Sequence, residues 1–139
     1  MYKFINFKSL LCSYLFLFLA FLSYGQTDPL LQIRVDVVYL ASDDLQGRET
    51  GTAGEVMAAD YIRQRMQNIG LIPGGDASWF QEFRFASNPH ETKNQDKTGK
   101  NVLGFLNKKA KKTVVIGAHY DHLGHGASGS LSPNDHSIH

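Results

Sequence analysis

The run TVVIGA at residues 113–118 constrains the fold of this chain more than any other feature. It carries no charge, and β-branched side chains occupy its first four positions. A short, continuous apolar run of this kind predicts a strand that is buried on both faces. Such a strand needs layers of helix around it, and helical patterns precede it in the sequence. The expected fold class is therefore an α/β sandwich.

Two helices are predicted ahead of this strand. The Asp-Pro pair at residues 28–29 is typical of a helix start, and apolar side chains then recur along one face, at Leu30, Ile33, Val37 and Leu40. The second helix follows a polar loop at residues 43–54, where Thr52 and Glu55 form a capping box. Gly70 is placed to end this helix. Its predicted apolar stripe consists of Val56, Ala59, Ile62, Met66 and Ile69.

Two further strands are predicted between the second helix and the apolar run. Residues 79–85 are aromatic and β-prone, and residues 101–106 form a shorter apolar stretch. The polar residues 88–100 are expected to be a loop. A solvated turn should join residues 101–106 to the apolar run, because it contains Lys108, Lys109, Lys111 and Lys112.

Residues 1–25 are expected to be a secretory signal peptide. Lys3 and Lys8 precede an almost wholly apolar run of 13 residues, and Ser23 and Gly25 put small side chains at a cleavage site. The run is shorter than the about 20 residues that span a bilayer, so stable membrane insertion is not expected. The mature chain, residues 26–139, is predicted to be periplasmic or secreted.

Composition excludes several kinds of chemistry. The single cysteine lies in the predicted leader, so the mature chain has no thiolate nucleophile and no thiolate metal ligand. The formal net charge of +1 argues against a dedicated nucleic-acid-binding protein, which would carry a basic excess.

The candidate chemistry lies where the apolar run ends. His119 comes directly after the run, and Asp121 follows two residues later. Ligands of open α/β sheets bind at the carboxyl ends of strands, and imidazole is a ligand suited to zinc. Asp121 could accept a hydrogen bond from the other ring nitrogen and fix its tautomer. By itself, the His-x-Asp pattern also fits a histidine at a strand end beside a solvated aspartate.

Four blocks together resemble the N-terminal part of the M28 family of zinc metallopeptidases. They match that family in order and spacing over about residues 28–126. The blocks are Gly47-Arg48-x-x-Gly51-x-x-Gly54, Ala58-Ala59-x-Tyr61-Ile62, Gly70-Leu71 and Gly117-Ala118-His119-Tyr120-Asp121-His122-Leu123-Gly124.

This resemblance implies a mixed-sheet, three-layer sandwich of the zinc-exopeptidase type, incomplete in this chain. It implies an exported aminopeptidase that acts on peptides with two zinc ions, with His119 as a zinc ligand and Asp121 as the residue that orients it. The family's bridging aspartate and general-base glutamate have no recognisable counterpart before His139. Residues 26–139 are therefore expected to be the N-terminal part of such a domain, without its general base and inactive alone.

Two other functions remain open from the sequence. An M20-like zinc amidohydrolase also uses a strand-end His-x-Asp, although apolar residues and proline usually follow the aspartate there. An exported domain without catalytic activity is the third possibility. A metal held by three loop histidines, such as His119, His122 and His125, is a further alternative.

Overall fold

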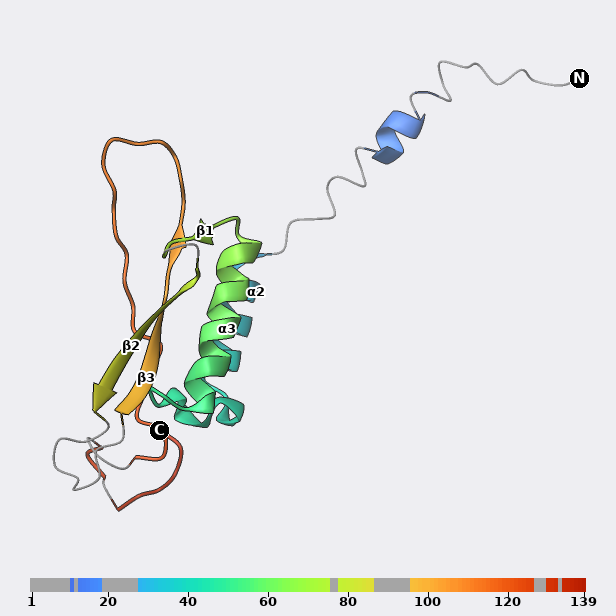
Figure 1. Cartoon of the computed structure of the whole chain (residues 1–139). Coiled ribbons are helices and arrows are strands. Elements are labelled where there is room, and N and C mark those ends of the chain that lie inside the picture. Colours follow the sequence, from blue (N-terminus) through green and yellow to red (C-terminus); the bar gives the residue numbers. More distant parts are fainter. Residues whose placement is uncertain are drawn as a thin grey trace, which may run out of the picture. The chain divides into compact units, whose positions relative to one another are not determined.

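The computed structural model describes residues 11, 13–18, 28–75, 78–86, 96–126, 130–132 and 134–139. The chain divides into two compact units, Met1–Val37 and Val38–His139. The elements in chain order are α2 (Pro29–Leu40), the 3₁₀ segment η1 (Asp43–Arg48), α3 (Ala53–Asn68), β1 (Ile72–Pro73), β2 (Phe80–Ala86), β3 (Asp96–Val102) and β4 (Gly104–Phe105) (Figure 1).

The N-terminal helix begins where the sequence predicts. The backbone N–H of Leu30 donates to the Asp28 carboxylate at 3.0 Å, which caps α2 at its first turn. No residue of α2 is buried. Of the predicted leader, residues 11 and 13–18 are helical, and the predicted cleavage site at residues 23–25 lies outside the described residues. No helix in the described ranges is long and apolar enough to cross a membrane.

Helix α3 begins at the predicted Thr52 cap and buries part of the predicted stripe. The Thr52 hydroxyl accepts from the Glu55 backbone N–H at 3.5 Å, which is one half of the predicted capping box. The Glu55 side chain accepts from the Gly51 N–H rather than from the Thr52 N–H, so the other half does not form. The buried side chains of the helix are Glu55, Ala58 and Ala59, whereas the predicted stripe members Val56 and Ile69 are 38% and 66% exposed. The predicted stripe is therefore right in part, because Ala59 is buried and Ile62 and Met66 are half-buried. After the helix, Gly70 has φ +85°, the left-handed conformation expected of a residue that ends a helix.

Strand β2 confirms the aromatic strand, but its partner was predicted to be loop. β2 pairs antiparallel with β3, from Phe80 opposite Val102 to Ala86 opposite Asp96. Residues 96–100 are thus a strand, and the prediction of a loop there was wrong. Their polar sequence carries no strand signal of its own. The ladder to β2 and the contact with α3 hold them extended instead.

The predicted strand at residues 101–106 is divided at Leu103. The Leu103 N–H donates to the Trp79 carbonyl at 2.8 Å, and its carbonyl accepts from the Gly74 N–H at 2.9 Å. The chain therefore exchanges one pairing partner for another at this residue. Beyond it, β4 pairs antiparallel with β1, and the described strands form two separate two-stranded sheets.

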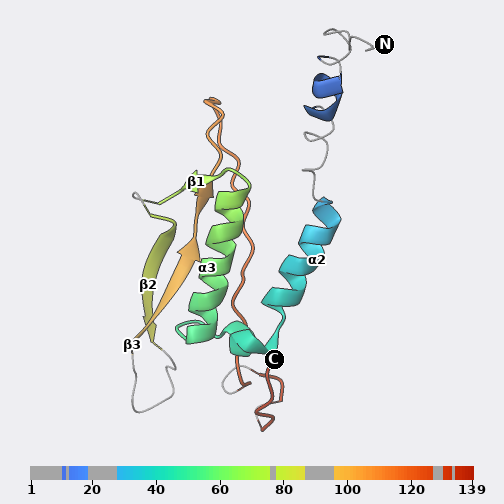
Figure 2. The same cartoon turned by 90° about the vertical axis from the view of Figure 1, so that its right-hand side faces the viewer.

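Residues 113–118 do not form the buried strand that the sequence predicts. Val114, Val115 and Ile116 are 84%, 88% and 93% exposed. Both views draw this part of the chain as a plain trace that joins no strand (Figures 1 and 2). An apolar run forms a strand only when a neighbouring strand completes its hydrogen bonds, and the described residues supply none here. The fold is thus mixed α and β, with two small antiparallel sheets.

The start of α3 packs tightly against η1 because Gly54 has no side chain. A Cβ added at Gly54 would lie 1.9 Å from the Leu45 carbonyl oxygen. Leu45 is fully buried, so it has no free space into which to move.

Gly54→Ala is expected to lower the free energy of unfolding by about 2 kcal/mol, because the new methyl group must displace the η1 backbone. Urea denaturation followed by circular dichroism measures the change. Gly117→Ala is the matched control, since a Cβ there would meet nothing within 4 Å. Equal stability of the two variants would contradict the close packing of α3 on η1.

Candidate functional site

Two segments that are far apart in the sequence form the frame of the candidate site. The Arg48 side chain donates through Nε to the Tyr120 carbonyl at 2.7 Å, and the His122 N–H donates to the Arg48 carbonyl at 3.1 Å. Glu49 and His122 form a parallel bridge between the two stretches. The block at residues 47–54 therefore runs directly beside the block at residues 117–124, which contains His119. The spacing along the chain does not reveal this arrangement.

His119 and Asp121 lie side by side, and the hydrogen bond of the imidazole is to the backbone oxygen of Asp121 rather than to its carboxylate. The His119 Nδ1 atom is 3.0 Å from the Asp121 backbone oxygen and 3.5 Å from the Asp121 Oδ1 atom. A carbonyl oxygen can only accept, so in a neutral ring we assign the proton to Nδ1 and the free lone pair to Nε2. The imidazole is 86% exposed. This state of the ring suits a metal ligand.

The Asp121 carboxylate is itself held in place. The Thr50 hydroxyl donates to its Oδ2 atom at 2.8 Å, while Oδ1 faces the imidazole of His119. Thr50 belongs to the loop between η1 and α3. The polar loop therefore orients the aspartate, and the aspartate faces the histidine.

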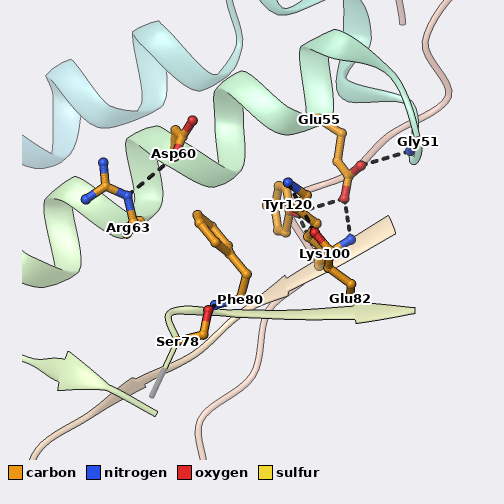
Figure 3. Close-up of polar contacts among 9 residues, drawn as sticks. All are labelled: Gly51, Glu55, Asp60, Arg63, Ser78, Phe80, Glu82, Lys100 and Tyr120. Carbon is orange, nitrogen blue, oxygen red and sulfur yellow. Dashed lines mark hydrogen bonds and ion pairs between the residues drawn. The ribbon is translucent and has the colours of Figure 1, made fainter. Parts of the chain in front are cut away.

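A buried carboxylate lies behind this pair. Glu55 is 1% exposed, and its Oε2 atom accepts from the Gly51 N–H at 2.9 Å. Its Oε1 atom accepts from the Lys100 N–H at 2.8 Å and from the Tyr120 hydroxyl at 2.9 Å. Figure 3 shows Glu55 reaching from α3 to these groups. One side chain thus joins the loop before α3, strand β3 and the segment that carries His119.

The Tyr120 hydroxyl has two acceptors for its single proton. Besides Glu55, the Lys100 carbonyl oxygen lies 2.6 Å from it. Burial raises the pKa of Tyr120 well above its ordinary value, and the hydrogen bond to Glu55 and the charges of Glu55 and Asp121 raise it further. The neutral hydroxyl is the form that the folded protein favours.

A cavity of about 740 Å³ adjoins these residues. Ile62 and Met66 of α3 and Val102 of β3 line its apolar side, and His119 and Asp121 line it as well. The candidate pair is therefore at the wall of a space that can hold a small molecule or a side chain.

The other loop histidines do not join the pair. The His122 Nδ1 atom accepts from the Leu123 N–H at 2.8 Å, and the His125 Nδ1 atom is 3.3 Å from the His136 carbonyl oxygen. In the part of the chain that the structure describes, no three histidine, cysteine, aspartate or glutamate side chains gather to hold a metal ion.

Sequence reasoning missed the roles of Glu55, Thr50 and Arg48. The sequence marks Glu55 as a capping residue, a position that is usually solvated, and no local pattern indicates that it is buried. Arg48 and Glu49 had no assignable partner in the sequence. In the structure Arg48 binds backbone carbonyls, and Glu49 pairs with the Lys97 ammonium at 2.8 Å.

Comparison with known proteins gives one informative similarity. The chain is 33% identical over 76 residues to the alkaline phosphatase isozyme conversion protein of Escherichia coli (strain K12). The matched region is 54% of this chain and 21% of that relative, so the chain spans about a fifth of the relative's length. No protein-family model matches the chain. No solved structure matches it either.

The raised pKa of Tyr120 predicts a pH dependence of stability. The contribution of its hydroxyl is complete below the pKa of a tyrosine in the unfolded chain, about 10, and is lost as pH rises beyond that value. The free energy of unfolding should therefore fall more steeply above pH 10 in the unmodified protein than in Tyr120→Phe. Urea titrations at several alkaline pH values measure both slopes, and parallel slopes would disprove the assignment.

Proposed function

We propose that this protein is an exported, zinc-dependent exopeptidase of the M28 type, most specifically an aminopeptidase. The observation that carries the proposal is the His119–Asp121 pair. In it the Nδ1 atom of the imidazole contacts oxygen atoms of Asp121, which leaves Nε2 available to a metal ion. The four blocks that resemble the M28 family support it, and two of them, residues 47–54 and 117–124, lie side by side at this pair. The proposed architecture of the complete domain is the three-layer sandwich of zinc exopeptidases.

The similar protein of Escherichia coli supports the same class of function. Its name states that it converts isozymes of alkaline phosphatase. Conversion of one form of an enzyme into another is an action on a protein, and hydrolysis of a peptide bond is one way to achieve it. Export is proposed from the predicted leader at residues 1–25.

The donor chemistry of His119 fits zinc. A neutral imidazole with its second nitrogen hydrogen-bonded is the usual form of a histidine ligand. A catalytic zinc site has about three protein ligands, and the described residues arrange one of them. The other ligands of the two zinc ions, and the general base, would lie outside the described residues. When bound, zinc supplies Lewis-acid activation of the peptide carbonyl and of water.

The residues on this chain have separate tasks in the proposed reaction. His119 would bind the metal through Nε2, and Asp121 would keep the proton on Nδ1. Thr50 would hold Asp121 in its orientation through the 2.8 Å hydrogen bond. The cavity beside them would receive part of the peptide substrate.

The test measures zinc content and hydrolysis of aminoacyl-4-nitroanilides by the protein as the cell exports it. Asp121→Asn is expected to lower zinc affinity roughly 10- to 100-fold, because an amide orients the imidazole less well than a carboxylate. His119→Ala should lose hydrolysis, and a chelator should abolish it until zinc is restored. His125→Ala is the matched control, since its ring contacts a backbone carbonyl away from the pair.

Other outcomes identify the alternative functions. Zinc-dependent release of acyl groups from amino acids, without cleavage of aminoacyl-anilides, would indicate an M20-like amidohydrolase. A protein without retained zinc and without hydrolysis would be a non-catalytic exported domain, and the proposed function would then be wrong.

A further inference from the structure

We propose that Glu55 is a positioning residue for His119 and Asp121, and that it acts through the hydroxyl of Tyr120. The proposal deepens the proposed function, since it concerns the same pair. It rests on the proposed function only where it assigns metal binding to the pair.

The Glu55 carboxylate cannot move freely. Its two oxygens accept three hydrogen bonds, from the Gly51 and Lys100 backbone N–H groups and from the Tyr120 hydroxyl, at 2.8–2.9 Å. Two of these donors are backbone groups of a loop and a strand. The side chain is 1% exposed, so water does not compete for it. The carboxylate is therefore a fixed point between α3 and β3 (Figure 3).

The position of the Glu55 carboxylate determines the direction of the Tyr120 side chain. The hydroxyl contacts Glu55 Oε1 and the Lys100 carbonyl oxygen, at 2.9 and 2.6 Å. Both acceptors lie on the side of the segment that faces α3 and β3. The phenol ring must therefore enter the interior to satisfy its hydroxyl.

Tyr120 stands between His119 and Asp121 in the chain, so a fixed direction of its side chain also fixes the short stretch of backbone that carries the pair. All three residues line the same cavity, and the 3.5 Å contact between His119 and Asp121 forms beside it. A different direction of Tyr120 would separate the imidazole from the carboxylate.

The end of η1 and the loop after it hold the same segment by separate bonds. Arg48 donates to the Tyr120 carbonyl, and Thr50 donates to Asp121. These bonds locate the backbone and the aspartate. Rotation of the segment is prevented by the contact of the Tyr120 hydroxyl, and this separates the role of Glu55 from general support of the fold.

The experiment reads the tautomer of His119 by NMR of the ¹⁵N-labelled full chain, without metal, at a pH about two units above the ordinary imidazole pKa of about 6.5. In the unmodified protein the Nδ1–H form should dominate. Tyr120→Phe removes the hydroxyl and keeps the ring, and we expect His119 to relax to the tautomer mixture of free imidazole, in which Nε2–H predominates.

Two glutamate variants complete the design. Glu55→Gln should shift the tautomer in the same direction, because an amide replaces an acceptor that faces three donors. Glu82→Gln is the matched control: Glu82 is 61% exposed and meets the Lys100 ammonium at 3.6 Å, so its loss should leave His119 unchanged. Dispersed backbone amide signals confirm that each variant is folded.

The outcomes separate this proposal from the proposed function. A folded Tyr120→Phe chain in which His119 keeps the Nδ1–H form would overturn the positioning role, whatever the enzyme assay shows. An unmodified protein in which Nδ1–H is not the dominant form of His119 would overturn it as well. A tautomer shift in a protein that proves to have no peptidase activity would support the positioning role and count against the proposed function alone.

Discussion

The structure of the candidate site depends on one buried carboxylate. Glu55 is almost fully excluded from solvent, and three donors from three parts of the chain satisfy it. Hydrogen bonds to a charged group contribute about 1.5–3 kcal/mol each, and an unsatisfied buried charge costs more than a neutral group would. The need to satisfy this buried carboxylate therefore holds together the loop before α3, strand β3 and the segment that contains Tyr120. Removing any one donor weakens the contact of the other two.

Close backbone approach is the second constraint on the site. The first turn of α3 packs against the Leu45 carbonyl because residue 54 is glycine. Gly47 has φ +67°, and a Cβ there would lie 2.6 Å from the Gly124 carbonyl oxygen. The contact at Gly54 brings α3 onto η1, and the contact at Gly47 brings η1 beside the segment that contains His119. The glycines of the first block thus serve the packing of the site, and Thr50 and Arg48 make its polar contacts.

The direction of the His119 ring decides what chemistry the pair can perform. Its Nδ1 atom faces oxygen atoms of Asp121, whereas the rest of the ring is open to solvent. A histidine held in this way offers one lone pair outward and keeps one proton inward, which suits metal binding. The neighbouring apolar residues Val115 and Ile116 share the wall of the same cavity. The pair therefore lies between the apolar lining of the cavity and the hydrogen bonds that Arg48 and Thr50 make to its segment.

The sequence by itself determined the local features of this protein. The Asp28 cap of α2, the Thr52 cap of α3, the glycine after α3 and the aromatic strand follow from residue types and short spacings, because caps, turns and periodicity act within a few residues. The closeness of His119 and Asp121 is equally local. Tertiary structure alone decided the rest. The polar residues 96–100 became a strand through pairing with β2, and the apolar residues 113–118 stayed unpaired in the described structure, because a strand depends on its neighbour. Glu55 became buried because Tyr120 and Lys100, distant in sequence, brought donors to it. Hydrogen bonds between remote residues leave no periodic trace in a sequence.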